Sequence, residues 1–406
     1  MSKDKAITLF GENAINLYLQ GSDIWNKWVK DNPDANVYFT GVDFSKFHQD
    51  GMYSANFKGF CFPSGVIDFS DAIFGNGLVS FTEASFNGFA VLFKNTDFGN
   101  GDVNFYFTKF LEASVSFQNA KFGAGNISFN EAMFGGAIDF SNITIEDGNL
   151  NFYGAYFDAT ILNFTFMTIN GGFNFLYAKN TENIREISFK YSNFNGYCEI
   201  TNSSFSCVVD LTQTKMANHV SLEGLVCEPI EVSHYKFLKK TFDKDNISRF
   251  RRLKELAENN KDHERALDFH AKEMRSKRFH ENTTYTGLFF DYSFDLLSNY
   301  GRSELRPFIA LVVIWFLFAL FYLLISPIAT VCFDGYCLKL GEALSFSGGQ
   351  VIPIIPGSQL ARAESIKKLF SGNLTPLIHL LTFLQSLISF TLFFLIGLAL
   401  RNRFRI

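Results

Sequence analysis

Two copies of one pattern fill the stretch Val79-Ser-Phe-Thr-Glu-Ala-Ser-Phe-Asn-Gly-Phe-Ala-Val-Leu-Phe-Lys-Asn-Thr-Asp-Phe98. In each copy a Val is followed two positions later by Phe, and a second Phe comes five positions after the first. The first Phe recurs at a 12-residue spacing, at Phe57, Phe69, Phe81, Phe93, Phe105, Phe117 and Phe129. A fixed period of this kind predicts a solenoid of stacked units rather than a globular catalytic domain.

The spacing also sets the size of one coil. Alternation with period 2 places each Phe and the small or aliphatic residue two positions before it on the inward face of an extended segment. Twelve residues at about 3.3 Å each trace only about 40 Å, too short a perimeter to hold two Phe rings. We therefore expect two units, or 24 residues, per coil. The 12-residue spacing is interrupted at residues 179–183, after which the period becomes 11.

Five-residue pieces of the repeat, such as Ala84-Ser-Phe-Asn-Gly88 and Ala132-Met-Phe-Gly-Gly136, resemble the pentapeptide-repeat family. The resemblance covers about residues 37–228 and implies a right-handed, four-sided β-helix. The alternating spacing of five and seven departs from the uniform fives of the family and implies widened corners. Residues 21–33 are similar to the helix that caps the first coil in many such proteins, and an open end would expose Phe rings and unpaired strand edges.

Charge is distributed unevenly along the chain. Residues 37–228 hold 19 acidic and 9 basic residues, a net charge of −10, whereas residues 229–406 hold 16 and 23, a net charge of +7. One interpretation of the acidic charge of residues 37–228 is that they mimic DNA, as some pentapeptide-repeat proteins do. We favour the alternative, that surface charge keeps a Phe-filled solenoid soluble, and expect no nucleic-acid partner. The sequence contains no phosphate loop, nucleophile elbow or HExxH motif, so we predict no enzymatic activity, no cofactor and no metal site.

Two apolar stretches near the C-terminus are long enough to cross a membrane. Pro307–Ile325 has 19 uncharged residues and Leu377–Leu400 has 24, against a requirement of about 20. Basic residues, which stay on the cytoplasmic side, flank both stretches: Arg302, Arg306, Arg401, Arg403 and Arg405. We therefore expect a multi-pass protein of the bacterial inner membrane with both termini cytoplasmic and residues 326–376 outside. The polar start of the chain, which lacks a signal peptide pattern, agrees with this topology.

The outer loop carries two unusual features. Cys332 and Cys337 bracket an Asp-Gly turn, and we predict a disulfide between them in an oxidising compartment. Residues 340–356 are apolar but too short to span, which predicts a half-helix broken at Gly-Gly and Pro, in a re-entrant or interfacial segment. Its candidate residues are Ser345, Ser347, Gly348, Gly349 and Gln350. The alternative is a loop that packs on the outer surface of the helices.

A span, a half-helix and a second span form the arrangement of two-transmembrane tetrameric cation channels, although no Thr-Val-Gly-Tyr-Gly filter follows. The second apolar stretch also carries polar residues three or four positions apart on one helical face: His379, Thr382, Gln385, Ser386 and Ser389. Polar groups in hydrocarbon must find water or partners, so this stripe lines a pore or hydrogen-bonds another helix. We expect either arrangement to require a second chain.

Residues 248–279 contain two helical patterns, separated by a turn at residues 259–262 with Asp262 as the N-cap. His270 and Glu273 lie one turn apart in the second pattern, and we interpret them as solvated surface rather than metal ligands. The predicted domains are a helical cap (1–36), the β-helix (37–229), a cytoplasmic hairpin and linker (230–300) and a two-transmembrane domain (301–406). The fold class is mixed, a pentapeptide-type β-helix followed by α-helices.

Two functions remain open from the sequence. The first is a homo-oligomeric channel-like protein of the lipid membrane, with a tetramer favoured, whose cytoplasmic solenoid senses an unknown protein or ligand. A membrane effector in bacterial defence is one use of such a protein. The alternative is a membrane-tethered scaffold whose acidic β-helix binds a cytoplasmic protein.

Overall fold

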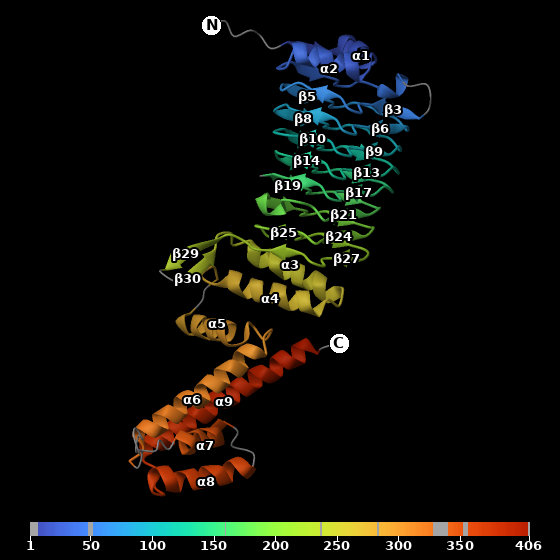
Figure 1. The fold of residues 1–406 in the computed structure, drawn as a ribbon. Coiled ribbons are helices and arrows are strands. Elements are labelled where there is room, and N and C mark those ends of the chain that lie inside the picture. The colour runs from blue at the N-terminus through green and yellow to red at the C-terminus, as the bar shows by residue number, and fades with distance from the viewer. Residues whose placement is uncertain are drawn as a thin grey trace, which may run out of the picture. The chain divides into compact units, whose positions relative to one another are not determined.

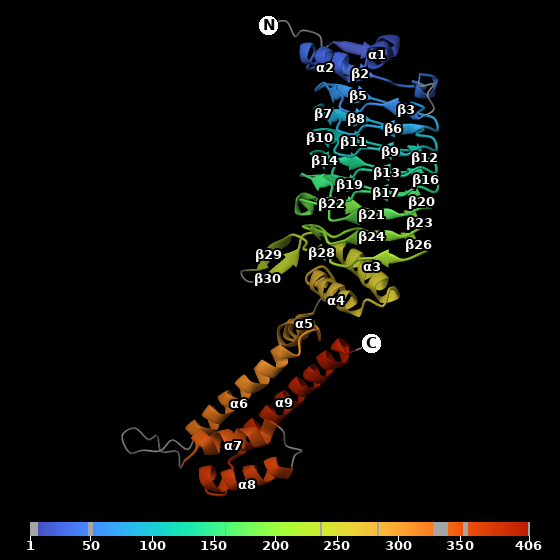
Figure 2. The same cartoon turned by 45° about the vertical axis from the view of Figure 1, so that its right-hand side comes forward.

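The computed structural model describes residues 7–47, 52–158, 160–235, 238–281, 284–327, 340–351 and 356–404. The chain forms two compact units, Met1–His280 and Glu281–Ile406. Short parallel strands in stacked sheets make up most of the first unit, and the second is helical in its described residues (Figures 1 and 2).

Two eight-stranded and two five-stranded sheets build the first unit. The first eight-stranded sheet contains, in spatial order, β1 (Thr8–Phe10), β2 (Asn36–Tyr38), β5 (Val66–Asp68), β8 (Ala90–Leu92), β11 (Ser114–Ser116), β15 (Ile138–Asp139), β19 (Ile161–Asn163) and β22 (Glu186–Ser188). The second contains β27 (Val220–Ser221), β24 (Cys198–Thr201), β21 (Phe173–Leu176), β17 (Leu150–Asn151), β13 (Ile127–Ser128), β9 (Val103–Asn104), β6 (Leu78–Ser80) and β3 (Tyr53–Asn56).

The five-stranded sheets complete the stack. One contains β18 (Tyr156–Phe157), β14 (Met133–Phe134), β10 (Lys109–Phe110), β7 (Ser85–Phe86) and β4 (Cys61–Phe62). The other contains β12 (Lys121–Phe122), β16 (Thr144–Ile145), β20 (Thr168–Ile169), β23 (Asn193–Phe194) and β26 (Lys215–Met216). Two smaller sheets follow, a parallel pair of β25 (Ser204–Phe205) with β28 (Val226–Cys227) and an antiparallel pair of β29 (Glu231–Tyr235) with β30 (Leu238–Thr241).

The pairing register gives the length of one coil. Val79 pairs with Val103, 24 positions further on, so this coil holds two 12-residue units, as the Phe spacing predicted. Further along, Ile127 pairs with Leu150, 23 positions on. Beyond the short 3-10 helix at Thr181–Asn183, Cys198 pairs with Val220, 22 positions further on. The change to an 11-residue period is therefore confirmed, and each later coil is shorter by two residues.

Phenylalanine rings of successive coils form columns in the core. The ring centroids of Phe81 and Phe105 lie 4.9 Å apart with 2° between the ring planes, and those of Phe105 and Phe129 lie 4.6 Å apart. Neighbouring columns meet edge to face, as where Phe93 lies 5.5 Å from Phe81 at 80°. Each of these rings is 0% exposed. Aromatic pairs add about 0.5–1.5 kcal/mol beyond the burial of apolar surface, so the columns hold adjacent coils in register.

One corner of the stack carries a ladder of side-chain amides. Asn95, Asn119 and Asn142 have φ angles of 55°, 59° and 58°, the left-handed conformation that Asn tolerates better than most residues. The amide of Asn119 donates to Oδ1 of Asn95 over 2.9 Å, and that of Asn142 donates to Oδ1 of Asn119 over 2.7 Å. The corner conformation thereby aligns donors and acceptors of successive coils.

Helices α1 (Gly11–Tyr18) and α2 (Ser22–Asp31) cover the first coil. The indole Nε1 of Trp25 donates to the carbonyl of Cys61 over 2.8 Å, and the hydroxyl of Tyr18 accepts from the backbone of Asn56 over 2.9 Å. Trp25 is fully buried against the Phe columns. Burial raises the pKa of Tyr18 to about 12, so its hydroxyl remains neutral.

Helices α3 (Asn246–Asn259) and α4 (His263–Lys277) cover the last coil. The guanidinium of Arg265 donates to the carbonyl of Leu225 over 3.1 Å, and Lys272 Nζ donates to that of Cys227 over 3.1 Å. These contacts satisfy backbone acceptors at the end of the stack, where no further coil pairs with them. Asp262 Oδ1 accepts from the backbone of Arg265, which confirms the predicted N-cap.

The interpretation of Glu273 as solvated surface is wrong. Its side chain is 4% exposed and forms ion pairs with Arg251 (3.0 Å) and Lys277 (2.9 Å), while His270 Nδ1 lies 4.0 Å away. Burial disfavours the charged carboxylate, but hydrogen bonds from Lys277 and Arg251 outweigh burial and hold the pKa of Glu273 below its ordinary value. The residue is a buried anion that ties α3 to α4.

The second unit contains α5 (Tyr285–Ser298), α6 (Leu305–Ile325), α7 (Leu340–Val351), α8 (Pro356–Phe370) and α9 (Pro376–Arg403). By length and composition, α6 and α9 are able to cross a membrane. They pack antiparallel, because Leu311 near the start of α6 clusters with Leu392 and Leu395 in the second half of α9. Helix α7 packs against both.

Candidate functional site: a polar junction between apolar helices

Gln385 lies at the centre of a hydrogen-bonded junction between α6, α7 and α9. It is 0% exposed in the middle of the apolar helix α9. The hydroxyl of Tyr322 on α6 donates to Gln385 Oε1 over 2.9 Å. Gln385 Nε2 in turn donates to the hydroxyl and the carbonyl oxygens of Ser347 on α7, at 2.8 and 3.0 Å. Both ends of the amide therefore have partners.

Ser347 extends the junction to the middle of α6. Its hydroxyl donates to the carbonyl of Trp315 over 2.8 Å, and the indole of Trp315 donates to the carbonyl of Leu344 over 2.9 Å. Trp315 is the eleventh of the 21 residues of α6. Helix α7 therefore reaches past the middle of α6, since Val351 at its end packs near Leu311, the seventh residue of α6.

The other predicted residues of α9 differ in their surroundings. Thr382 is buried and its hydroxyl donates to the carbonyl of His379 over 2.9 Å, while His379 itself is exposed. Ser386 donates to the carbonyl of Gln350 over 3.3 Å. Ser389 is fully buried, and among the described residues its hydroxyl has no hydrogen-bond partner. The expectation that this stripe needs a second chain is wrong for Gln385, because α6 and α7 of the same chain supply its partners.

The half-helix ends later than expected. We predicted a break at Gly348-Gly349, but α7 continues through both residues to Val351. A Cβ on Gly348 would lie 3.4 Å from the indole nitrogen of Trp315, and one on Gly349 would lie 3.0 Å from the carbonyl oxygen of Ser358 on α8. The two glycines therefore allow α6 and α8 to approach α7 closely, a use of small residues that is typical of helices packed in membranes.

Two other predicted residues of α7, Gln350 and Ser345, differ in how far they are buried. Gln350 is buried, and its side-chain nitrogen has no hydrogen-bond partner in the part of the chain that the structure describes. Ser345 is half-buried. Cys332 and Cys337 lie outside the described residues, so their disulfide stays a prediction.

Helix α8 returns along α7. Its start lies beside Gly349, and near its end Lys368 forms an ion pair with Glu342 over 2.8 Å. The hydroxyl of Ser326, just beyond α6, donates to the carbonyl of Leu369 over 2.6 Å. The two helices thus form a hairpin that is anchored where α6 ends and extends to the middle of α6.

Sequence reasoning missed Tyr322 and Trp315, which stood within an uncharged span. A signal was present, because Tyr hydroxyl and Trp N–H groups normally find partners when buried. The junction is made of amide, hydroxyl, indole and backbone groups, which exchange hydrogen bonds and do not titrate near neutral pH. Such an arrangement fixes the positions of three helices and offers polar atoms at mid-helix.

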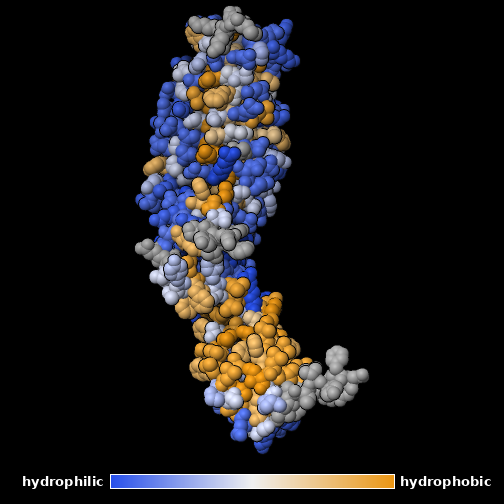
Figure 3. All heavy atoms as spheres, turned by 90° about the vertical axis from the view of Figure 1, so that its left-hand side faces the viewer, coloured by the Kyte–Doolittle hydropathy of each residue, from blue (hydrophilic) through white to orange (hydrophobic). Residues whose placement is uncertain are grey.

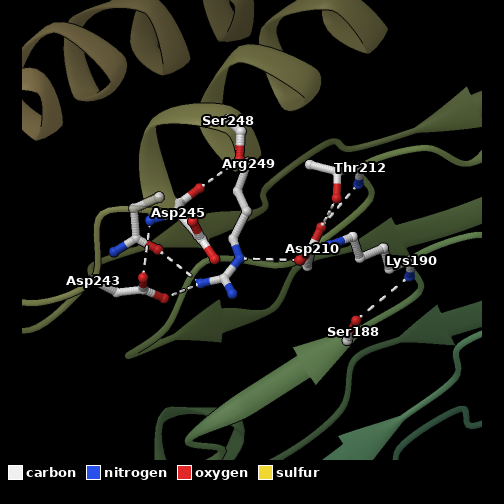
Figure 4. Close-up of polar contacts among 9 residues, drawn as sticks. Ser188, Lys190, Asp210, Thr212, Asp243, Asp245, Ser248 and Arg249 are labelled. Carbon is white, nitrogen blue, oxygen red and sulfur yellow. Dashed lines mark hydrogen bonds and ion pairs between the residues drawn. The ribbon is translucent and has the colours of Figure 1, made fainter. Parts of the chain in front are cut away.

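A second candidate lies where α3 meets the strands. Arg249 Nε lies 3.2 Å from Asp210 Oδ2, and its Nη1 contacts Asp243 (Figure 4). Burial lowers the pKa of Arg249, but the two carboxylates raise it more, so the guanidinium is a fixed positive charge. It lines an open pocket of about 520 Å³ together with Cys207 and Lys244. Burial raises the pKa of Cys207 to about 12, which leaves a neutral, unreactive thiol there.

Comparisons with known proteins find no matching family model, no matching curated protein and no matching solved structure.

Proposed function

We propose that the chain is an oligomeric, channel-like integral membrane protein whose N-terminal solenoid senses a cue in the cytoplasm. The observation that carries the proposal is the junction at Gln385. Helix α7 ends beside α6 without following its whole length, and its Ser347 contacts Gln385 of α9 and Trp315 of α6 at the level of the middle of α6. A helix that ends within a membrane needs neighbours or water for its last carbonyl groups.

The length of α6 supports a re-entrant position for α7. The 21 residues of α6 rise about 31 Å at 1.5 Å each. This length is close to the thickness of the hydrocarbon core, so α6 spans with little tilt. The level of Trp315 is then near the bilayer midplane. The hairpin also carries Arg362, Glu364 and Lys367 on α8, charges that are costly against lipid tails and favour a water-filled path between several copies. A tetramer is the assembly that we favour.

The ends of the two apolar helices support a topology with both termini in the cytoplasm. The side-chain amide of Asn402 donates to the carbonyl of Gly301 over 3.1 Å, and Arg403 pairs with Glu304. The basic residues before α6 and after α9 therefore gather at one end of the helix pair. Basic residues remain on the cytoplasmic side, here of a bacterial inner membrane.

In this proposal the first unit is a pentapeptide-type, four-sided β-helix that receives the cue. The pocket beside Arg249 offers one place for a small polar ligand, because it combines a fixed guanidinium with Lys244 and Asp243. Residues 280–306 would carry the response to α6. Depolarisation of the membrane during bacterial defence is one use of such a response.

Purification in detergent, determination of the number of chains, and recording in planar bilayers test the proposal. We expect an oligomer with measurable conductance. Gln385→Leu and Ser389→Leu should change that conductance and leave membrane insertion intact. Phe390→Leu is the matched control, since Phe390 is 68% exposed beside them on α9. A strict monomer without conductance under all conditions would contradict the proposal.

The second candidate function is a membrane-tethered scaffold. Apolar side chains interrupt the polar surface of the first unit (Figure 3), and Phe89, Leu111 and Ile161 are 80%, 46% and 47% exposed. An exposed apolar surface favours binding of a protein partner. If the scaffold is correct, substitutions at Gln385 and Ser389 have no effect on activity, and residues 1–280 alone capture the partner and preserve the function.

A further inference from the structure

Helix α5 has an apolar face that remains exposed in the described chain. Tyr285, Phe289 and Leu296 are 93%, 67% and 74% exposed. At 3.6 residues per turn these three positions fall within about 40° of one another around the helix. On the other side, Phe294 and Leu297 pack against a cluster formed by α6 and α9. In the described chain the face of Tyr285, Phe289 and Leu296 is therefore uncovered, while the opposite side is covered at Phe294 and Leu297 but exposed at Phe290, which is 69% exposed.

Polar contacts fix α5 at the end of the helix pair. Arg306 in the first turn of α6 donates to the carbonyl of Asp295 over 3.2 Å. The hydroxyl of Tyr300 donates to Asp291 Oδ1 over 2.7 Å. Six residues separate α5 from α6, so α5 must lie close to the start of α6.

We propose that α5 is an interfacial helix whose exposed face lies in the headgroup region of the leaflet on the side of Arg302 and Arg306. The inference rests on the proposed membrane insertion of α6 and α9, but it does not require a channel. A helix of this kind buries aromatic and aliphatic side chains at the boundary of headgroups and acyl chains. Tyr is enriched there because its ring is apolar and its hydroxyl remains hydrated.

A lipid surface fits this face better than a protein partner for two reasons. First, the first turns of α6, which α5 packs against, are also apolar and exposed, with Phe308 and Ile309 at 54% and 52%, so α5 adjoins a segment that would face lipid. Second, Arg302 and Arg306 on one side and Arg401 and Arg403 on the other supply positive charge for anionic headgroups. A protein covering α5 would also have to displace lipid from α6.

Photo-crosslinking of the full chain identifies what covers this face. We would replace Phe289 with p-benzoylphenylalanine and reconstitute the protein in vesicles of phosphatidylethanolamine and phosphatidylglycerol. After irradiation, mass spectrometry would identify the adducts. Two matched variants carry the same group at Phe316, 48% exposed on α6, and at Phe107, 44% exposed in the first unit. We expect lipid adducts at positions 289 and 316, in yields several-fold above that at position 107.

The other outcomes overturn the inference in distinguishable ways. If position 316 yields lipid adducts while position 289 crosslinks to another copy, crosslinks to residues 1–280 or yields no adduct, α5 is not interfacial and the membrane proposal stands. If neither position yields lipid, membrane insertion fails and the inference fails with it.

Discussion

The two units differ in where their large apolar and their polar side chains lie. In the first unit the fully buried residues are mainly phenylalanines, such as Phe81 and Phe117, and the surface is largely polar (Figure 3). In the second unit Phe383 and Phe390 are 65% and 68% exposed, whereas Gln385 between them is 0% exposed. The contrast is what the proposed membrane position of the second unit would produce. Water favours burial of apolar groups, while hydrocarbon requires buried partners for polar groups.

The two units should also respond differently to the substitution of a buried residue. In the first unit a core residue is one member of a long column, so a defect spreads to the coils on either side. In the second unit a few hydrogen bonds orient three helices whose other contacts are apolar and less directional. The predictions below test this contrast, from the largest expected effect to the smallest.

Phe117→Asp should destabilise the first unit most. The ring of Phe117 lies 4.8 Å from that of Phe93 and 4.6 Å from that of Phe140, so the new carboxylate would be buried without a partner. Such a charge costs about 3–5 kcal/mol. Urea unfolding followed by far-UV circular dichroism measures the loss. Phe107→Asp is the control, because Phe107 is partly exposed, and an equal loss in that variant would contradict a buried-column explanation.

Glu273→Gln should weaken the helical cover of the last coil in a pH-dependent manner. The pKa of Glu273 in the folded chain lies below its ordinary value of 4.5, so its contribution is fully present above about pH 4.5. The contribution is lost as the pH falls through the folded-state pKa. At pH 7 we expect a loss of about 1.5–3 kcal/mol, typical of hydrogen bonds to a charged group.

Thermal unfolding of the unmodified protein and of the Glu273→Gln variant between pH 7 and pH 3 measures this loss of stability. The gap in melting temperature should narrow as the solution becomes acidic. A gap that stays constant over the whole range would show that Glu273 acts through packing rather than through its charge.

Gln385→Leu should loosen the second unit by a smaller amount. It removes the acceptor of Tyr322 and the donor to Ser347, and interhelical hydrogen bonds in membranes contribute about 1–2 kcal/mol at most. Ser389→Ala is the control, because its hydroxyl has no partner to lose. Unfolding in mixed detergent measures both, with the fluorescence of Trp315 as the readout in a chain whose Trp25 and Trp28 are replaced by Phe. Equal behaviour of the two variants would contradict the central role of the Gln385 amide.

The sequence predicted the first unit better than the second, for a physical reason. A solenoid repeats one environment, so the spacing of Phe57, Phe69 and Phe81 reports coil length and inward direction at every position. The 24-residue register and the later 11-residue period follow from that spacing. The ladder at Asn95 and Asn119 was not predicted, because it depends on which corners adopt positive φ.

The junction of the second unit depends on information that no local pattern contains. The spacing of the polar residues on α9 predicted a shared face, but its partners Tyr322 and Ser347 lie on two other helices. Which helix faces the stripe is decided by the rotation and depth of α7. The same limit applies to Glu273, whose partner Arg251 comes from the preceding helix.

The smallest expected effect concerns the corners of the first unit. Phe107 has a φ of 55°, which is unfavourable for a bulky side chain. Asn119 has a similar φ at its own corner, and Asn tolerates this conformation. Phe107→Asn should therefore raise the free energy of unfolding by about 0.5–1 kcal/mol, since Asn adopts this conformation at lower cost. Urea unfolding measures the change, with Phe89→Asn as the control because Phe89 is exposed without a positive φ. A gain in stability accompanied by loss of partner capture would show that Phe107 is retained for binding and would favour the scaffold. A loss of stability would mean that its contact with Tyr106, at 4.2 Å between ring centroids, outweighs the strain of the corner.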